Sequence, residues 1–224
     1  MRVMPQRPHV RALTEGMNDM FDLMGMRHLS YEGPVLDDKR TLRRLPGALR
    51  DILRTINGFI AFDGGFHMRG ACREPSWHSI AAAMQGEHAI HRLFAPVSPA
   101  DIPFAQDALG DQFLLREDGV WRLRAETATM IKLDQDLDTF FATLQREPLE
   151  VLDMDPLIAY RRQAGHMPPG HLLQVEPPFC LQEQVGAPVK LSVAEVRVVL
   201  ERLSQLAAKV NLTPEGLDLF DLVR

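Results

Sequence analysis

The sequence predicts a fold of the α+β class, in which helices accompany antiparallel strands that follow one another along the chain. The first observation is a compact pattern of strands and turns over residues 102–123, and the second is a set of helical apolar repeats on both sides of it. The third is the charge, which is −5 in total but −8 over residues 100–155, where 13 acids face five bases. The acidic region therefore coincides with the predicted strands.

The first part of the chain predicts two helices. Apolar residues in the range 13–24 recur at intervals of three and four, which is typical of an amphipathic helix that packs in a core. The range 37–56 predicts a second helix. Asp37 or Asp38 can cap its start, or the main part of the helix can begin at Pro46. Asn57 and Gly58 end this helix, because both tolerate the left-handed conformation of a C-terminal cap.

Short strands and one more helix are expected between residues 59 and 91. Apolar runs at 59–62 and 66–68 flank an Asp-Gly-Gly turn and predict two strands. The range from Trp77 to His91 has a helical pattern that is broken or weakened at Gly86.

The central pattern predicts a small antiparallel meander. Two apolar runs within Ile102–Leu115 are separated by a break at residues 108–110, and a turn at Asp118-Gly119 leads into a third run at 120–123. Asp107 and Asp111 flank the break, where short carboxylates can accept backbone N–H groups and hold a turn. A further strand at 127–133 and a helix at 135–144, opened by Asp134, complete this part.

Three phrases of this sequence carry a family resemblance. The central one consists of Ile102-Pro103-Phe104-Ala105 followed by Asp107, Gly110, Asp111, Phe113 and Leu115. Upstream, the helix stripe ends in Asn57-Gly58-Phe59 and is followed by Gly64-Gly65-Phe66. Downstream lies the acidic, phenylalanine-containing helix at 137–144. In this order the phrases resemble the SMI1/KNR4 superfamily, the SUKH domains.

The resemblance implies a mostly antiparallel central sheet flanked by helices over residues 1–147. It also implies that several residues of the signature are fold determinants rather than contacts, namely Asn57, Gly58, Gly65, Trp77, Pro103 and Gly110. Bacterial members of the superfamily are commonly immunity proteins that neutralise polymorphic or contact-dependent toxins. Fungal relatives take part in cell-wall signalling, so a regulatory scaffold is an alternative.

Residues 148–224 lie outside the resemblance and are expected to form a C-terminal extension, packed on the first domain or folded as a small second one. Seven of the 16 prolines fall in 148–190, which predicts a linker or an irregular wrapping segment. Ser192 to Glu195 fits a capping box, and the apolar repeat after it predicts a helix that ends at Asn211. Residues 212–223 fit a terminal hairpin or a short helix.

The acidic charge favours a basic protein as partner and disfavours direct binding of nucleic acid, whose phosphates require cations. A toxin that acts on nucleic acids has a basic cleft, which carboxylates can block by mimicking phosphate. For Asp107 and Asp111 a structural role in the turn stays open beside a role in binding. The residues expected to contribute an acidic face are Asp107, Asp111, Glu117, Asp118, Asp134, Asp136 and Asp138.

No motif of the sequence carries a catalytic mechanism, so a protein without enzymatic activity, cofactor or metal is expected. GxGxxG, GxxxxGK, HExxH and GxSxG are missing. A small-molecule enzyme that uses Cys72 with His67 or His78 is the less favoured alternative. His78, His88 and His91 lack a further ligand at a defined spacing and are interpreted as structural or surface residues.

The expected location is the cytoplasm. Only two cysteines occur, far apart in the sequence, which favours a reducing compartment. The first residues lack the apolar core of a secretory signal, and no run approaches the roughly 18 apolar residues of a membrane helix.

Overall fold

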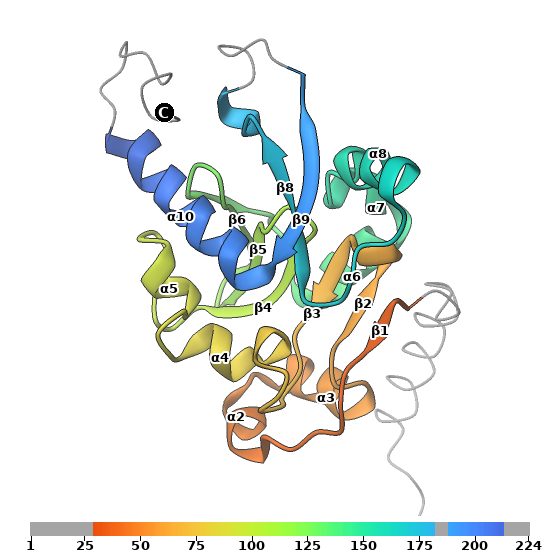
Figure 1. Ribbon diagram of the computed structural model, residues 1–224. Coiled ribbons are helices and arrows are strands. Elements are labelled where there is room, and N and C mark those ends of the chain that lie inside the picture. The colour runs from red at the N-terminus through yellow and green to blue at the C-terminus, as the bar shows by residue number, and fades with distance from the viewer. Residues whose placement is uncertain (1–28, 182–187, 213–224) are drawn as a thin grey trace, which may run out of the picture.

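The computed structural model describes residues 29–181 and 188–212 and shows an α+β fold (Figure 1). A seven-stranded antiparallel sheet contains its strands in chain order, from β1 to β7, and a two-stranded sheet pairs β8 with β9. The fold class predicted from the sequence is therefore confirmed. The strands are β1 (Tyr31–Glu32), β2 (Phe59–Ala61), β3 (Phe66–Met68), β4 (Ile102–Asp107), β5 (Gln112–Arg116), β6 (Gly119–Arg124), β7 (Thr129–Lys132), β8 (His171–Glu176) and β9 (Lys190–Glu195).

Tight turns explain why β4, β5 and β6 pair in chain order. Between β4 and β5 the Oδ1 atom of Asp107 accepts the N–H groups of Leu109 at 2.9 Å and Asp111 at 3.0 Å. Gly110 in the same turn has a φ of +90°. Between β5 and β6 only residues 117 and 118 separate the strands. Hairpins this short leave no alternative but antiparallel pairing of neighbours.

Helices cover both faces of the sheet. They are α2 (Lys39–Arg44), α3 (Gly47–Thr55), α4 (Ile80–Met84), α5 (Ile90–Leu93), α6 (Leu137–Arg146), α7 (Pro148–Val151), α8 (Asp155–Ala164) and α10 (Val196–Leu212), with short 3₁₀ turns η2 (Phe62–Gly64), η3 (Ser76–His78) and η4 (Phe179–Leu181). None of the helices in the described ranges has both the length and the apolar character needed to cross a bilayer.

Successive residues of β5 show how the two faces are divided. Phe113 belongs to an apolar cluster with α3, α6 and α8, and its ring centroid lies 5.0 Å from that of Phe140. Leu114 belongs to a second cluster with α4, α5 and α10. Because neighbouring residues of a strand point to opposite faces, the sheet separates two cores.

The C-terminal extension contributes to both cores. Leu173 of β8 lies in the cluster of Phe113, and Leu172 lies in the cluster of Leu114. The N–H of Leu173 donates to the carbonyl of Ala108 at 2.8 Å, which ties β8 to the β4–β5 turn. A Cβ added to Gly110 would meet the Leu203 side chain at 2.9 Å, so α10 approaches the same turn closely.

Three predicted helices have different boundaries in the structure. The range 37–56 forms two helices, because the chain extends at Leu45 and Pro46 cannot continue the hydrogen bonds of α2. The range 77–91 forms η3, α4 and α5 with a break around Gly86, whose φ is +129°. The helix after β7 begins at Leu137, because Asp136 rather than Asp134 caps it by accepting the N–H of Thr139.

Two predictions for the extension are wrong. The proline-rich range 148–190 is not an irregular linker in its described part but contains α7, α8 and β8. Ser192 to Glu195 is not a capping box but belongs to β9, where pairing with β8 outweighs the local helix signal; α10 then starts at Val196. The helix predicted at 13–24 and the element predicted at 212–223 lie outside the described residues, except for Leu212, the last residue of α10.

Candidate functional site

Five carboxylates gather at one end of the large sheet and are called the acidic corner: Glu117, Asp118, Asp134, Asp136 and Asp138. Two of them lie in the β5–β6 turn, and three lie in or just after the β7–α6 loop. Backbone hydrogen bonds hold the two segments together, because Val120 and the loop residues 133 and 135 bond to each other at 2.8 and 3.0 Å. At Gly119 an added Cβ would lie 2.6 Å from the Gln135 carbonyl oxygen, so the turn and the loop are in close contact.

The acidic corner is exposed and carries an excess of negative charge. All five of its side chains belong to exposed residues. Lys132 lies among them, with Nζ 3.1 Å from a carboxylate oxygen of Asp118 and 3.8 Å from one of Asp134. Hydrogen bonds from Trp121 and Lys132 lower the pKa of Asp118, and hydrogen bonds from Thr139 lower the pKa of Asp136. Both carboxylates are therefore ionised at neutral pH.

Asp107 and Asp111 do not belong to this surface, which corrects their assignment to an acidic face. Their side chains are 0% and 7% exposed. They lie in a group called the Arg122 cluster, which consists of the buried Asp107, Asp111 and Arg122 and the partly exposed Arg124 and Asp153. Arg122 donates to Asp107 at 2.7 Å and to Asp111 at 3.0 Å. The structural role of the two aspartates, which the sequence left open, accounts for their position.

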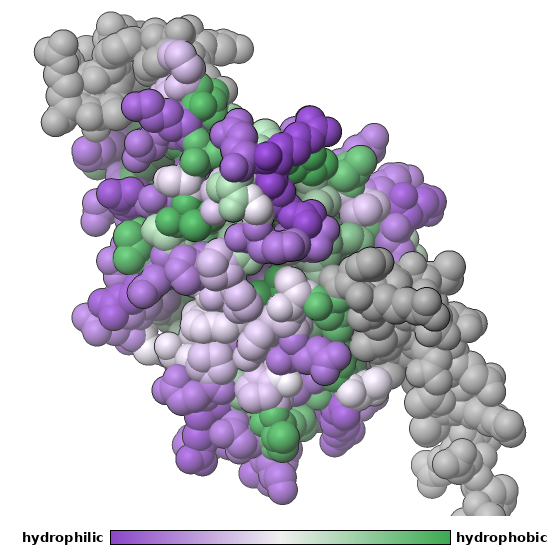
Figure 2. Space-filling view, turned by 45° about the vertical axis from the view of Figure 1, so that its right-hand side comes forward, coloured by the Kyte–Doolittle hydropathy of each residue, from purple (hydrophilic) through white to green (hydrophobic). Residues whose placement is uncertain are grey.

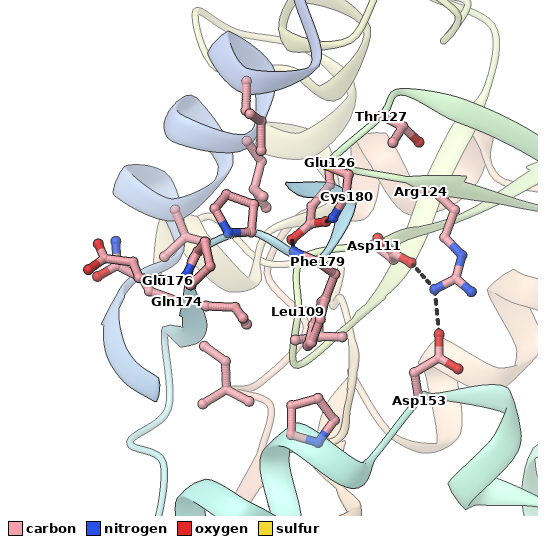
Figure 3. A pocket seen from close by; sticks show the side chains of 18 of the residues that line it. Leu109, Asp111, Arg124, Glu126, Thr127, Asp153, Gln174, Glu176, Phe179 and Cys180 are labelled. Atoms are coloured by element: carbon pink, nitrogen blue, oxygen red, sulfur yellow. Dashed lines mark hydrogen bonds and ion pairs between the residues drawn. The ribbon is translucent and has the colours of Figure 1, made fainter. Parts of the chain in front are cut away.

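The Arg122 cluster joins the sheet to the loop between α7 and α8. Arg122 faces Phe113 across the β5–β6 pair and donates to the Val151 carbonyl at 2.9 Å. Both arginines of the cluster bond to Asp153, and the Arg124 guanidinium also contacts Asp111 (Figure 3). Burial raises the pKa of the Asp107 carboxyl and Asp111 raises it further, while Arg122 opposes the rise.

A second buried polar group, the Arg69 cluster, consists of Arg69, His67, His78, Gln106 and Gln112. The Arg69 guanidinium donates to the side-chain oxygens of Gln106 at 2.6 Å and Gln112 at 2.7 Å, and to two backbone carbonyls of β4. Among the described residues it has no carboxylate partner. Burial accordingly lowers the pKa of Arg69 to about 9.

The hydrogen bonds of the two histidines have one consistent direction. His78 Nε2 lies 3.0 Å from the Asn57 carbonyl oxygen, which can only accept, so this nitrogen carries the proton. His78 Nδ1 then accepts from His67 Nε2 at 2.8 Å, and His67 Nδ1 accepts from the Gln106 amide at 3.2 Å. Both imidazoles are therefore neutral in this arrangement.

The predicted fold determinants lie around these clusters. The Asn57 side chain donates to the Pro34 carbonyl and accepts the Ala71 N–H at 2.7 Å. Gly58, with a φ of +78°, and Gly65 leave space that a Cβ would fill against Met68 and Met154, respectively. The Trp77 indole packs 5.2 Å from the His67 ring, and the Pro103 carbonyl accepts from Arg69.

Three of the histidines considered for catalysis or metal binding have other partners, and Cys72 is buried. Burial raises the pKa of the Cys72 thiol to about 11. His67 and His78 bond to each other, and His88 Nδ1 lies 3.2 Å from Glu201 of α10. Within residues 29–181 and 188–212, no group of three or more His, Cys, Asp and Glu side chains is placed to hold a metal ion.

An open groove of about 1580 Å³ lies at the opposite end of β6 and is called the α10 groove. One wall is α10, another is β8 with the segment 177–180, and a third is the loop between α7 and α8. Arg124 and Glu126 line the groove beside apolar side chains such as that of Leu109 (Figure 3). The face seen in Figure 2 is mostly hydrophilic, with apolar residues in separate small patches. The groove was not expected from the sequence, because segments up to 100 residues apart form it.

Comparisons with known proteins support the architecture. No family model matches the sequence, and no curated protein matches it. The structure is similar to the crystal structure of Atu4351 from Agrobacterium tumefaciens, with a TM-score of 0.54 and 13% sequence identity, over 83% of this chain and 88% of that one. At this identity the likeness shows a shared fold.

Proposed function

We propose that the chain is a non-catalytic binding protein of the SMI1/KNR4 type that neutralises a basic bacterial toxin in the cytoplasm. The observation that carries the proposal is the acidic corner, where five exposed carboxylates lie on adjoining segments and only two of them, Asp118 and Asp134, are near a lysine, Lys132. The sequence phrases that resemble the superfamily support the same function. A toxin that acts on nucleic acids fits best, because its cleft is built to bind phosphates.

The geometry of the corner suits rapid capture of a cation-rich surface. Charges fixed on a short turn lose little side-chain and backbone freedom on binding, and a field of one sign accelerates association. Association rates of sterically similar complexes rise by about tenfold or more through such steering at low salt, and salt removes the gain. The proposal therefore predicts its clearest effect in the association rate.

The test begins with the partner, recovered by affinity capture from the native cells and then expressed alone to establish that it is toxic. Its binding kinetics are measured at salt concentrations from about 50 to about 500 mM. Screening of the charges is weak at the lower concentration and strong at the higher one, because the Debye length shortens as salt is added. The corner variant exchanges each acid for its amide, which keeps the cap of α6 because asparagine also caps helices. It carries Glu117→Gln, Asp118→Asn, Asp134→Asn, Asp136→Asn and Asp138→Asn.

The corner variant should associate at least about tenfold more slowly at low salt and lose most of its salt dependence. A control removes the same number of exposed acids elsewhere and should keep most of the rate. It carries Glu32→Gln, Asp51→Asn, Glu74→Gln, Glu87→Gln and Glu195→Gln. Equal rates for wild type, corner variant and control would contradict the proposal, as would a partner that is not toxic.

A further inference from the structure

Glu126 presents an unusual carboxylate in the α10 groove. Both of its oxygens accept backbone N–H groups, from Phe179 and Cys180, each at 3.0 Å. Among the described residues no cation bonds to it, although its burial is substantial enough to raise its pKa. The two N–H donors hold the carboxylate in place but do not neutralise its charge.

The surroundings of Glu126 add to this negative charge. The Arg122 cluster, which reaches the groove through Asp111, Arg124 and Asp153, contains three carboxylates and two guanidiniums. The floor of the groove, meaning its charged lining residues that are not exposed, therefore has three acids, Asp111, Glu126 and Asp153, and one base, Arg124. Arg202, Lys209 and Lys190 also line the groove, but they belong to exposed residues, where water and salt screen them more strongly than the floor.

Size and apolar lining indicate the class of ligand. The volume of about 1580 Å³ exceeds the roughly 300–1000 Å³ of ordinary small-molecule pockets, so the groove accommodates a chain segment. Leu149 and Phe179, two of its lining residues, are 57% and 39% exposed. Exposed large apolar side chains that line a concavity are typical of protein docking sites.

We infer that the α10 groove binds a polypeptide segment of the partner in which a lysine or arginine, flanked by apolar side chains, reaches Glu126. This inference rests on the proposed function, because it assigns the segment to the same basic partner. The cation offsets part of the negative charge of the floor, and the flanking side chains cover Leu149 and Phe179. The groove is thus a second contact, at the other end of β6 from the acidic corner.

The first experiment uses a defined probe and does not require the partner. Three soluble heptapeptides with blocked ends differ in their central triplet, which is leucine–lysine–leucine, leucine–glutamine–leucine or leucine–glutamate–leucine. They are titrated into the ¹⁵N-labelled full chain while the amide signals of Phe179 and Cys180 are followed. One favourable charge contact of about 1.4 kcal/mol corresponds to a tenfold difference in Kd, so the lysine peptide should bind at least tenfold more tightly than the glutamate peptide.

Variants identify the atoms responsible. Glu126→Gln should reduce the preference for lysine over glutamine to less than about twofold, whereas Glu176→Gln, a change at an exposed residue of the rim, should retain it. Gln205→Arg places bulk and positive charge on the groove side of α10 and should abolish the shifts. Val198→Arg, on the same helix but outside the groove lining, is its matched control.

Several results would overturn the inference. They are the lack of a saturable shift with any peptide, equal binding of the lysine and glutamate peptides, and shifts that depend on protein concentration without peptide, which would indicate a second copy as occupant. Displacement of residues 213–224 by the peptide would assign the groove to the chain's own end. If Gln205→Arg leaves binding of the toxic partner intact while the corner variant weakens it, the proposed function stands and the groove assignment fails.

Discussion

The Arg122 and Arg69 clusters hold two buried arginines, one in β6 and one just after β3, but compensate their charges differently. Arg122 is 6% exposed and bonds to three aspartates, whereas Arg69 is 2% exposed and bonds to two glutamine side chains and two carbonyls. One arginine is balanced by ions and the other by neutral dipoles. Two arginines that are buried to a similar degree therefore differ in the groups that stay without a partner when the arginine is removed. These groups are carboxylates around Arg122 and neutral acceptors around Arg69.

Loss of Arg122 should produce the largest effect. In Arg122→Met the Asp107 and Asp111 carboxylates stay buried without their central cation, and removal of one member of a buried ion pair typically costs about 3–5 kcal/mol. The free energy of unfolding in urea measures the cost. Arg54→Met, which breaks the exposed ion pair with Asp51, should cost less than about 1 kcal/mol. A similarly small loss of stability for both variants would show that Arg122 does not stabilise the fold by compensating the charges of the buried aspartates.

Loss of Arg69 should cost less than loss of Arg122. Arg69→Met leaves neutral acceptors without a donor and at the same time removes a cation that burial disfavours, so we expect a loss of about 2–3 kcal/mol. The same urea titration gives the value, and an unchanged slope against urea confirms that the folded state is intact. A loss equal to or above that of Arg122→Met would reverse the comparison.

Acid should act on the Arg69 cluster through its histidines. Burial lowers the pKa of His67 well below its usual range, and burial also lowers that of His78 to about 4. Because the folded pKa values lie below the unfolded value, the unfolded state binds more protons, and stability is full above about pH 6.5 and falls as the pH drops towards 4. From pH 7 to pH 5 the shift of His78 alone corresponds to a loss of about 2 kcal/mol.

Thermal or urea unfolding at several pH values checks this dependence. The double variant His67→Gln/His78→Gln should start from a lower stability but lose less of it between pH 7 and pH 5. His166→Gln, a change at an exposed histidine, should follow the wild-type curve. Parallel curves for the double variant and the wild type would assign the acid sensitivity to other groups.

The sheet was predictable because its signals are local. Short turns at residues 108–111 and 117–119 separate apolar runs, and each run pairs with the next one in the chain. The exposed part of the site was predictable for the same reason: Glu117, Asp118 and the acids of the β7–α6 loop stand next to turn residues that bring them to the surface. The extension was not predictable, since its β8–β9 pairing joins segments that local patterns assign to a linker and a helix.

The buried part of the site could not be read from the sequence. The sequence does not distinguish a buried arginine from an exposed one. In addition, one partner of Arg122 is Asp153, which is 31 residues away in the chain. Asp107 and Asp111 occur at the spacing of a turn, and the turn was predicted correctly. Their exposure was predicted wrongly, because the sequence does not show that Arg122 lies beside them and that they are buried. Glu126 is recognisable only once the segment 179–180 is placed beside it.

The chain order of the seven strands has a consequence for synthesis of the protein. Each strand emerging from the ribosome finds the edge of the preceding one already available, and β4 to β7 can add to the sheet with short loop closures. The carbonyl of Ala108 and the surface over Gly110 remain uncovered until Leu173 and Leu203 have been translated. We expect a nascent chain that stalls before that point to expose the tip of the β4–β5 hairpin to chaperones and proteases, and docking of the extension to cover it.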